Sequence, residues 1–195
     1  MQIHPMRIPG SWDDGFALDF HTLSSEFLGH DEYGHATFDT RRTELGELLY
    51  RLKYQGDRST VASIAEAARD FLRRKDLGLE VVVPAPPSRQ RLVQPLFEIA
   101  DALGGLLGLP VDKASVRKVL ETPELKNVYE YAKRIEALEG AHAIEGEALR
   151  GRRILLLDDL YRSGATLNAV ARLLKADGGA SAVFALALTR TRSSS

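Results

Sequence analysis

Apolar and polar residues alternate along the N-terminal part of the chain. Between Phe16 and Phe38 this alternation surrounds a polar segment, residues 29–34, that contains two glycines. A period of two residues is typical of strands, and a polar segment between two such runs is typical of a turn. The pattern therefore predicts a β-hairpin over residues 16–38.

Two helical patterns follow the predicted hairpin. In the first, four leucines recur at helical spacing and Gly56 ends the segment. In the second, apolar residues recur up to Leu72, with Ser59 or Thr60 as the N-cap and Gly78 beyond the end. The apolar positions are Leu45, Leu48, Leu49 and Leu52 in the first helix, and Val61, Ile64, Ala65, Ala68, Phe71 and Leu72 in the second.

From Glu80 onward the pattern changes to strands that alternate with helices. Apolar runs at 81–84, 154–159 and 182–189, with a further strand near 110–119, are separated by helical patterns at 96–108 and 166–179. Continuous apolar strands are typical of parallel sheets that are buried on both faces. We therefore expect an α/β fold in the last two thirds of the chain. Residues 121–146 are charged and weakly periodic, which fits a mobile loop, a functional lid or an edge excursion.

Composition narrows the class of protein. With 195 residues, 44% of them hydrophobic, the chain can bury the core of one domain. Its 26 basic and 27 acidic residues nearly cancel, which argues against non-specific nucleic-acid binding. Cysteine is absent, so disulfides, thiolate zinc sites and a cysteine nucleophile are excluded. No signal peptide or membrane span is apparent, and we expect a cytoplasmic protein.

The strongest candidate site follows the apolar run Ile154–Leu157. Asp158 and Asp159 should emerge at the carboxyl end of a central strand, where open α/β sheets bind ligands. Two carboxylates there could bind the vicinal hydroxyls of a sugar or a divalent cation. The next turn offers backbone N–H groups at a helix start, hydroxyls and a guanidinium, which together suit a phosphate. The residues of this turn are Arg162, Ser163, Gly164, Ala165 and Thr166.

The segment 154–166 also has interpretations other than a ligand site. Asp158 could cap a backbone group, with Asp159 solvated and Thr166 a simple N-cap. Receiver domains also place acidic pairs after strands, but only 36 residues follow Asp159, too few for the rest of that fold. No strand is followed by the glycine pattern of a dinucleotide site. A ligand site is the interpretation that we favour.

The segment 154–166, ILLLDDLYRSGAT, resembles the phosphoribosyl pyrophosphate (PRPP) signature of type I phosphoribosyltransferases. Over residues 43–191 the chain is similar to their ComF branch, with weaker support from 48–58, 81–91 and 183–191. The resemblance implies that Asp158 and Asp159 engage the ribose hydroxyls, directly or through Mg²⁺, and that 162–166 hold the 5-phosphate. The chain departs from that pattern by lacking the cysteine zinc module, by having RLVQP at 91–95, and by having Arg-Ser before Gly164.

Further candidates lie in two polar segments. Ser88, Arg89 and Arg91 follow a strand and precede a helix, which suits an anion; the resemblance implies pyrophosphate, and the alternative is a proline-stiffened turn with solvated arginines. The resemblance also implies a catalytic flap within 121–146, although a solvated helix face would explain its charges nearly as well. The flap candidates are Lys126, Lys133 and Arg134.

Two other clusters receive a structural interpretation. Spacing at His21, His30 and His35 matches no zinc pattern, so we expect solvated hairpin histidines rather than a metal site. Tyr50, Lys53 and Tyr54 share a predicted helix and are expected to serve packing rather than base stacking.

The expected fold is an α/β, type I phosphoribosyltransferase-like parallel sheet flanked by helices. Residues 1–79 would form a hairpin and helices that act as a hood or dimer surface, 80–192 the core, and 193–195 a tail. The resemblance implies a homodimer that transfers a phosphoribosyl group from PRPP to a nitrogen nucleophile with Mg²⁺ as cofactor. A non-catalytic PRPP or nucleotide-binding regulator, or a ComF-like accessory protein of DNA uptake, is the alternative. The sequence does not name the acceptor.

Overall fold

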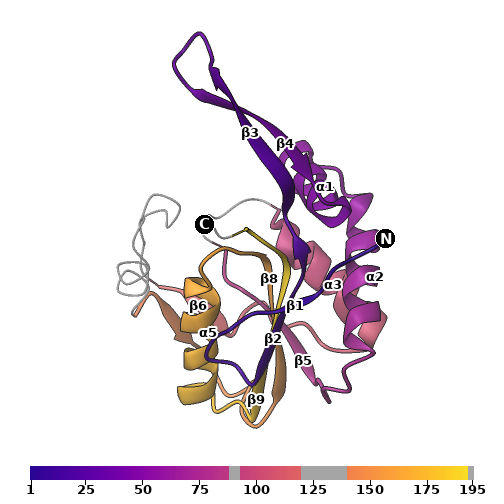
Figure 1. Cartoon of the computed structure of the whole chain (residues 1–195). Coiled ribbons are helices and arrows are strands. Elements are labelled where there is room, and N and C mark those ends of the chain that lie inside the picture. The colour runs from indigo at the N-terminus through magenta and orange to yellow at the C-terminus, as the bar shows by residue number, and fades with distance from the viewer. Residues whose placement is uncertain (88–92, 120–139, 193–195) are drawn as a thin grey trace.

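A computed structural model describes residues 1–87, 93–119 and 140–192 of the chain (Figure 1). Its strands alternate with helices, as the pattern predicts for an α/β fold. In chain order the elements are β1 (Met6–Arg7), β2 (Asp14–Phe20), β3 (Thr22–His30), β4 (Ala36–Arg42), α1 (Glu44–Tyr50), the π-helical turn η1 (Arg51–Gln55), α2 (Thr60–Leu72), β5 (Val81–Pro84), α3 (Pro95–Leu107), β6 (Val116–Lys118), β7 (His142–Ile144), β8 (Arg153–Tyr161), α5 (Ala165–Ala176) and β9 (Ala182–Arg190).

A five-stranded sheet forms the centre of the molecule, in the order β1-β2-β9-β8-β5. The strands β2, β9, β8 and β5 run parallel, and only the edge strand β1 is antiparallel. The apolar run Ile154–Leu157 of β8 is at most 1% exposed, because helices cover both faces of the sheet. These observations confirm the predicted parallel sheet with flanking helices.

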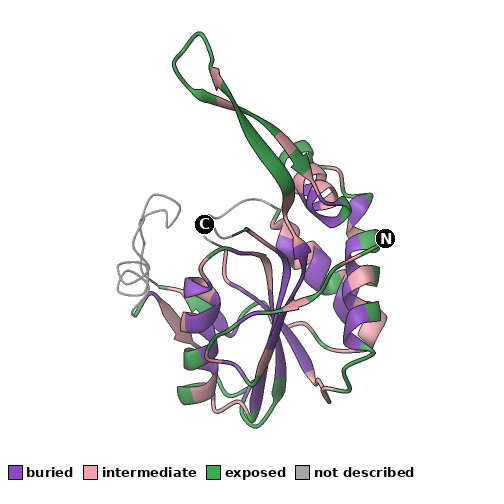
Figure 2. Ribbon diagram, in the orientation of Figure 1, coloured by how far each residue is buried: buried purple, intermediate pink, exposed green. Residues whose placement is uncertain are grey.

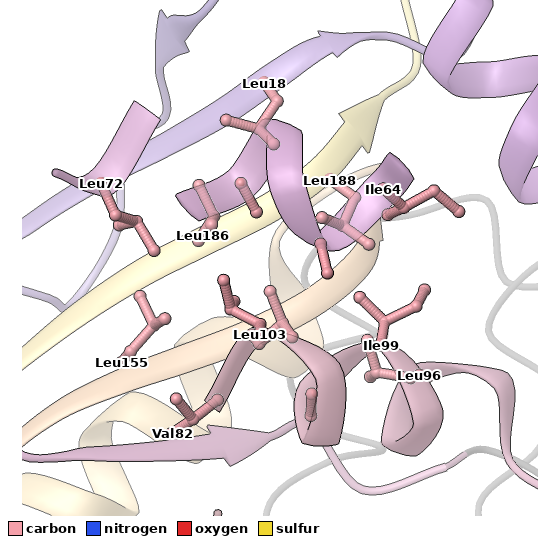
Figure 3. Close-up of a cluster of buried hydrophobic side chains, with 14 of the residues drawn as sticks. Leu18, Ile64, Leu72, Val82, Leu96, Ile99, Leu103, Leu155, Leu186 and Leu188 are labelled. Carbon is pink, nitrogen blue, oxygen red and sulfur yellow. The ribbon is translucent and has the colours of Figure 1, made fainter. Parts of the chain in front are cut away.

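The two faces of the sheet bury separate apolar clusters. On one face, side chains of α1, α2 and α3 pack against alternate residues of the strands, among them Leu155 and Leu186 (Figure 3). On the other face, α5 packs against the intervening residues, such as Ile154 and Leu156. This division follows from the strand geometry, in which successive side chains point to opposite faces.

The N-terminal hairpin begins and ends later in the chain than the predicted range of 16–38. The strands of the hairpin are β3 and β4, and residues 14–20 instead form β2, which pairs with β9 in the central sheet. Residues 15–19 are buried without interruption, which is typical of a parallel strand rather than of an exposed hairpin. The carboxylate of Asp31 accepts the backbone N–H groups of Tyr33 and His35 and thereby shapes the turn. The hairpin extends away from the sheet and is largely exposed (Figure 2).

The strand expected near 110–119 is also divided. Val111 forms a single parallel bridge with Val82, and β6 pairs with β7 in a separate two-stranded sheet. Asp112 explains the break, because its carboxylate accepts the backbone N–H groups of Ala114 and Ser115 and turns the chain. Of the charged segment 121–146, only residues 140–146 lie within the described ranges.

Helix boundaries agree with the capping signals. Thr43 caps α1 by accepting the N–H of Gly46, and Gly56 ends η1 with a left-handed φ of 70°. The helix α2 begins after Ser59, as predicted, and ends at Leu72. Among the described residues, no helix has both the length and the apolar composition to span a membrane.

Candidate functional site

The acidic pair lies on β8, at the carboxyl edge of the parallel sheet. The sequence pattern predicts that the strand ends at these acids, but β8 continues to Tyr161 because β9 pairs with it as far as Arg190. The neighbour on the other side, β5, pairs only as far as Leu157. Asp158 and Asp159 therefore stand beyond the end of β5 while β9 still supports their backbone, and their side chains point to opposite faces of the strand.

The environment of Asp158 favours its neutral form. Its Oδ1 accepts the backbone N–H of Asp159 at 2.9 Å, and the residue is half-buried. Burial of the carboxyl, together with the negative charge of Asp159, raises the pKa of Asp158 to about 7, although the N–H bond from Asp159 and the charge of Lys53 act in the opposite direction. A cation or a hydroxyl donor at this carboxyl would offset both unfavourable effects.

Asp159 forms an ion pair with a residue far away in the sequence. Its Oδ2 lies 2.6 Å from Nζ of Lys53, and the two side chains are only 21% and 26% exposed. Lys53 belongs to η1, and single π-turns are rare and often occur at functional sites. The helical pattern assigned Lys53 to packing and did not indicate this contact. Helical spacing relates only residues of one segment, so it could not reveal a contact with β8.

His21 and Thr189 form a second connection to Asp159. The buried hydroxyl of Thr189 donates to the backbone carbonyl of Asp159 at 3.1 Å, and Nδ1 of His21 lies 3.1 Å from the same hydroxyl. Burial lowers the pKa of His21, and the positive charges of Arg42, Lys53 and Arg162 lower it further against the opposing charge of Asp159.

The three histidines considered together in the sequence lie in different surroundings. His35 pairs with Asp31 at the hairpin turn, His30 packs against Phe27, and His21 lies beside the acidic pair. Within the described part of the chain, no group of three or more His, Asp or Glu side chains could hold a metal ion. The acidic pair by itself would therefore need oxygen atoms from a ligand or from water to complete the coordination of a cation.

The turn after β8 requires a glycine at position 164. Gly164 has φ 73°, and a Cβ atom there would come within 2.5 Å of the Tyr161 ring, so glycine is needed on both counts. The helix α5 begins at Ala165, so the first N–H groups of the helix face the turn without partners inside the helix. The side chain of Asn168 fixes the turn by donating to the carbonyl of Gly164 at 2.9 Å and accepting the N–H of Ser11 at 2.7 Å.

Several of the predicted site residues belong to one continuous segment of the sequence, at the end of β8 and the start of α5. Arg162 is exposed, Ser163 and Thr166 are half-buried, and all three lie within a few residues of Asp159. The remaining candidates lie outside the described residues. They are Ser88, Arg89 and Arg91 of the predicted pyrophosphate site, and Lys126, Lys133 and Arg134 of the predicted flap.

Comparison with known proteins identifies the class. The chain is 33% identical over 140 residues to adenine phosphoribosyltransferase of Mycobacterium marinum, which covers 70% of this chain and 69% of that protein. It is 30% identical over 148 residues to competence protein ComFC of Bacillus subtilis, covering 74% of this chain but only 59% of ComFC. No family model matches the chain.

A solved structure agrees with this assignment at the level of the fold. Adenine phosphoribosyltransferase from Leishmania tarentolae superposes with a TM-score of 0.51 at 12% identity, over 96% of this chain and 94% of that one. The chain belongs to the type I phosphoribosyltransferase family. Within that family, the chain is similar both to an adenine phosphoribosyltransferase and to a competence protein.

Proposed function

We propose that this protein binds PRPP with Mg²⁺ and transfers its phosphoribosyl group to a nitrogen nucleophile, with release of pyrophosphate. One observation carries the proposal. In a chain of this family, the acidic pair and the glycine turn before α5 form one continuous segment at the carboxyl edge of the sheet. That edge is where α/β sheets bind their ligands.

Each part of PRPP has a chemically suitable counterpart. The 5-phosphate would lie against residues 162–166, where N–H groups, hydroxyls and the guanidinium of Arg162 can donate to it. The ribose hydroxyls would donate to Asp158 and Asp159. A hydroxyl donor beside Asp159 must share its carboxylate with the ammonium of Lys53 or displace it. Ser88, Arg89 and Arg91 remain our candidates for the pyrophosphate.

Mg²⁺ fits the same acidic pair. Its usual sites in proteins combine one or two carboxylates with water and with oxygen atoms of the substrate phosphates. Asp158 and Asp159 would hold the ion, directly or through the ribose hydroxyls, and the ion would supply positive charge against the departing pyrophosphate. Burial and the charge of Asp159 raise the pKa of Asp158, and a bound cation would act against both effects.

The chain's own groups can support the substitution at C1 of the ribose. The bond between C1 and the pyrophosphate oxygen breaks, its electron pair leaves with pyrophosphate, and the acceptor nitrogen forms the new bond with its lone pair and releases its proton to water or to pyrophosphate. The ring carries positive charge at the transition state, which the carboxylates on β8 would stabilise. Candidate flap residues Lys126, Lys133 and Arg134 would exclude water, which otherwise competes as the nucleophile.

Pyrophosphate release tests the proposal. Purified protein would be incubated with PRPP, Mg²⁺ and, one at a time, adenine, guanine, hypoxanthine, uracil and simple amines. We expect pyrophosphate only when a suitable acceptor is present, and formation of the matching nucleotide. PRPP that binds but is never consumed, with any acceptor, would contradict transfer.

The similarity to ComFC favours a second candidate, a PRPP- or nucleotide-binding protein without transferase activity. In that case the acidic pair would serve ligand recognition alone. The same assay separates the two candidates, because a binding protein would show Mg²⁺-dependent affinity for PRPP with no pyrophosphate released.

A further inference from the structure

The backbone of His21 is held between two parts of the molecule. Its N–H donates to the carbonyl of Arg190 at 2.8 Å, and its own carbonyl accepts the N–H of Thr43. Gly46 packs so closely that a Cβ atom there would lie 2.1 Å from this carbonyl. The histidine is therefore fixed between the end of β9 and the start of α1, although it precedes the exposed hairpin.

The hydrogen bonds of Thr189 determine which ring nitrogen of His21 carries the proton. The hydroxyl has one hydrogen, and the carbonyl of Asp159 can only accept it. The oxygen of Thr189 must then accept its second hydrogen bond, so Nδ1 of His21 is the donor. The neutral ring consequently has an unprotonated Nε2. Among the described residues, this Nε2 has no hydrogen-bond partner and is not sealed from solvent.

The charged groups around the imidazole of His21 favour its neutral form, and they belong to the candidate site. Arg42 and Lys53 lie on the N-terminal side, Arg162 on the turn before α5, and Asp159 on β8, all near enough to influence its pKa. The three cations outweigh the one carboxylate and, with burial, lower the pKa of His21. A neutral imidazole with a free lone pair is a hydrogen-bond acceptor.

We propose that Nε2 of His21 accepts a hydrogen bond from an N–H group of the nitrogen nucleophile. This inference rests on the proposed transfer reaction and adds an acceptor-binding residue to it. If the acidic pair binds the ribose hydroxyls, C1 of the ribose and the nucleophile that attacks it would lie near these carboxylates. His21 is beside the same carboxylates, because its ring and the backbone carbonyl of Asp159 bond the same hydroxyl of Thr189. It selects acceptors that present an N–H donor over those that present only lone pairs.

Nitrogen-15 NMR of histidine-labelled protein tests the tautomer without any substrate. The spectrum of the His21→Asn variant assigns the signals of His21. At about pH 7.5, above the ordinary histidine pKa, we expect a protonated Nδ1 and an unprotonated Nε2. The opposite tautomer would overturn the inference whatever the protein catalyses.

Kinetics with two variants test the contact itself. In His21→Asn, the amide can still donate to Thr189 but no acceptor reaches the former position of Nε2. In His21→Gln, the longer side chain can place an amide oxygen near that position. With whichever nucleobase the wild type uses, we expect kcat/KM to fall at least about tenfold in His21→Asn and to recover in part in His21→Gln. The affinity for ribose 5-phosphate should stay unchanged, and His35→Asn at the exposed hairpin turn is the matched control.

The outcomes separate this inference from the proposed function. Full activity in His21→Asn would overturn the inference and leave the transfer reaction intact. Equal loss in both variants, together with weaker ribose 5-phosphate binding, would assign His21 to the architecture of the site and also overturn the inference. A wild type that releases no pyrophosphate with any acceptor would contradict the proposed function, and the inference with it.

Discussion

The two sides of the acidic pair are built in different ways. On the α5 side, residues 161–168 follow one another in the sequence, and short hydrogen bonds within the segment give the turn its shape. On the N-terminal side, Lys53 and His21 come from separate elements and meet β8 only through tertiary contacts. The first side is a local motif, whereas the second depends on the whole fold. Substitutions on the α5 side should therefore change the affinity for the phosphate. Substitutions at Lys53 and His21 should change the charge of the acidic pair and the selectivity for the acceptor.

The acidic pair is common to both sides, and its removal should have the largest effect. We expect Asp158→Asn combined with Asp159→Asn to reduce Mg²⁺-dependent PRPP affinity by more than about a hundredfold, which corresponds to about 2.7 kcal/mol. Isothermal titration calorimetry measures the affinity. Asp70→Asn on the exposed face of α2 is the control, and circular dichroism verifies folding. PRPP affinity retained in the double variant would rule out our assignment of the ribose site.

The α5 side should be sensitive to backbone conformation. Gly164→Ala places a Cβ at φ 73° and against the Tyr161 ring, and we expect unfolding free energy to fall by about 1 to 3 kcal/mol with weaker binding of ribose 5-phosphate. Gly105→Ala, at an open position in α3, should instead gain up to about 1 kcal/mol. Thermal unfolding with and without ribose 5-phosphate tests both. Equal stability of the two variants would mean that the turn relaxes freely.

The acidic pair itself should be sensitive to pH. Because the folded pKa of Asp158 is about 7, above the unfolded value near 3.8, the folded state binds more protons between these values. The contribution of Asp158 to stability therefore falls as pH rises from about 4 to about 7. In chelator, we expect the unfolding free energy of the wild type to decrease relative to Asp158→Asn across this window. Parallel curves for the two proteins would show that Asp158 titrates normally.

Charge substitutions should move this pH window in opposite directions. Lys53→Met removes a positive charge that lowers the pKa of Asp158, and Asp159→Asn removes a negative charge that raises it. We therefore expect the pKa of Asp158 to increase in the first variant and to decrease in the second. Carbon-13 NMR of the aspartate carboxyl groups follows both titrations, and a shift in the same direction for both would refute the proposed couplings.

The smallest expected effect concerns a single hydroxyl on the α5 side. Thr166→Ala should weaken ribose 5-phosphate binding by about 1 kcal/mol, the usual net contribution of one hydrogen bond. Thr166→Ser keeps the hydroxyl and is expected to keep the affinity. If alanine has no effect in calorimetry, the backbone N–H groups of α5 hold the phosphate without help from this side chain.

The contrast between a contiguous motif and a site built from tertiary contacts also explains how much could be predicted from the sequence. The strands β5, β8 and β9, the helices and the turn at Gly164 follow from short-range patterns of apolar residues and glycine, and the structure confirms them. The alternation of apolar residues did not show that residues 14–20 form a strand of the central sheet, paired with β9, rather than part of the hairpin. The Asp112 turn likewise interrupted a strand that the apolar residues alone had predicted.

The candidate site shows the same limit. The acidic pair and its turn were identified because they are contiguous, although β8 continues two residues beyond the predicted end at Asp159. Lys53 and His21 were assigned to packing and to solvent, because their contacts with Asp159 and Thr189 connect positions more than 100 residues apart. Only the packed fold brings Lys53 and His21 close to Asp159 and Thr189. The spacing of apolar residues along the sequence contains no information about such contacts.

The most direct test of the PRPP site is thermal unfolding of the wild type and of the double variant at Asp158 and Asp159, with PRPP and Mg²⁺ or with PRPP and chelator. Ligand at about 100 times its dissociation constant adds about 2.7 kcal/mol, which should raise the midpoint by about 5 to 11 °C for a chain of this size. We expect that rise only in the wild type with Mg²⁺. An equal rise in the double variant, or none in the wild type, would contradict a PRPP site at the acidic pair.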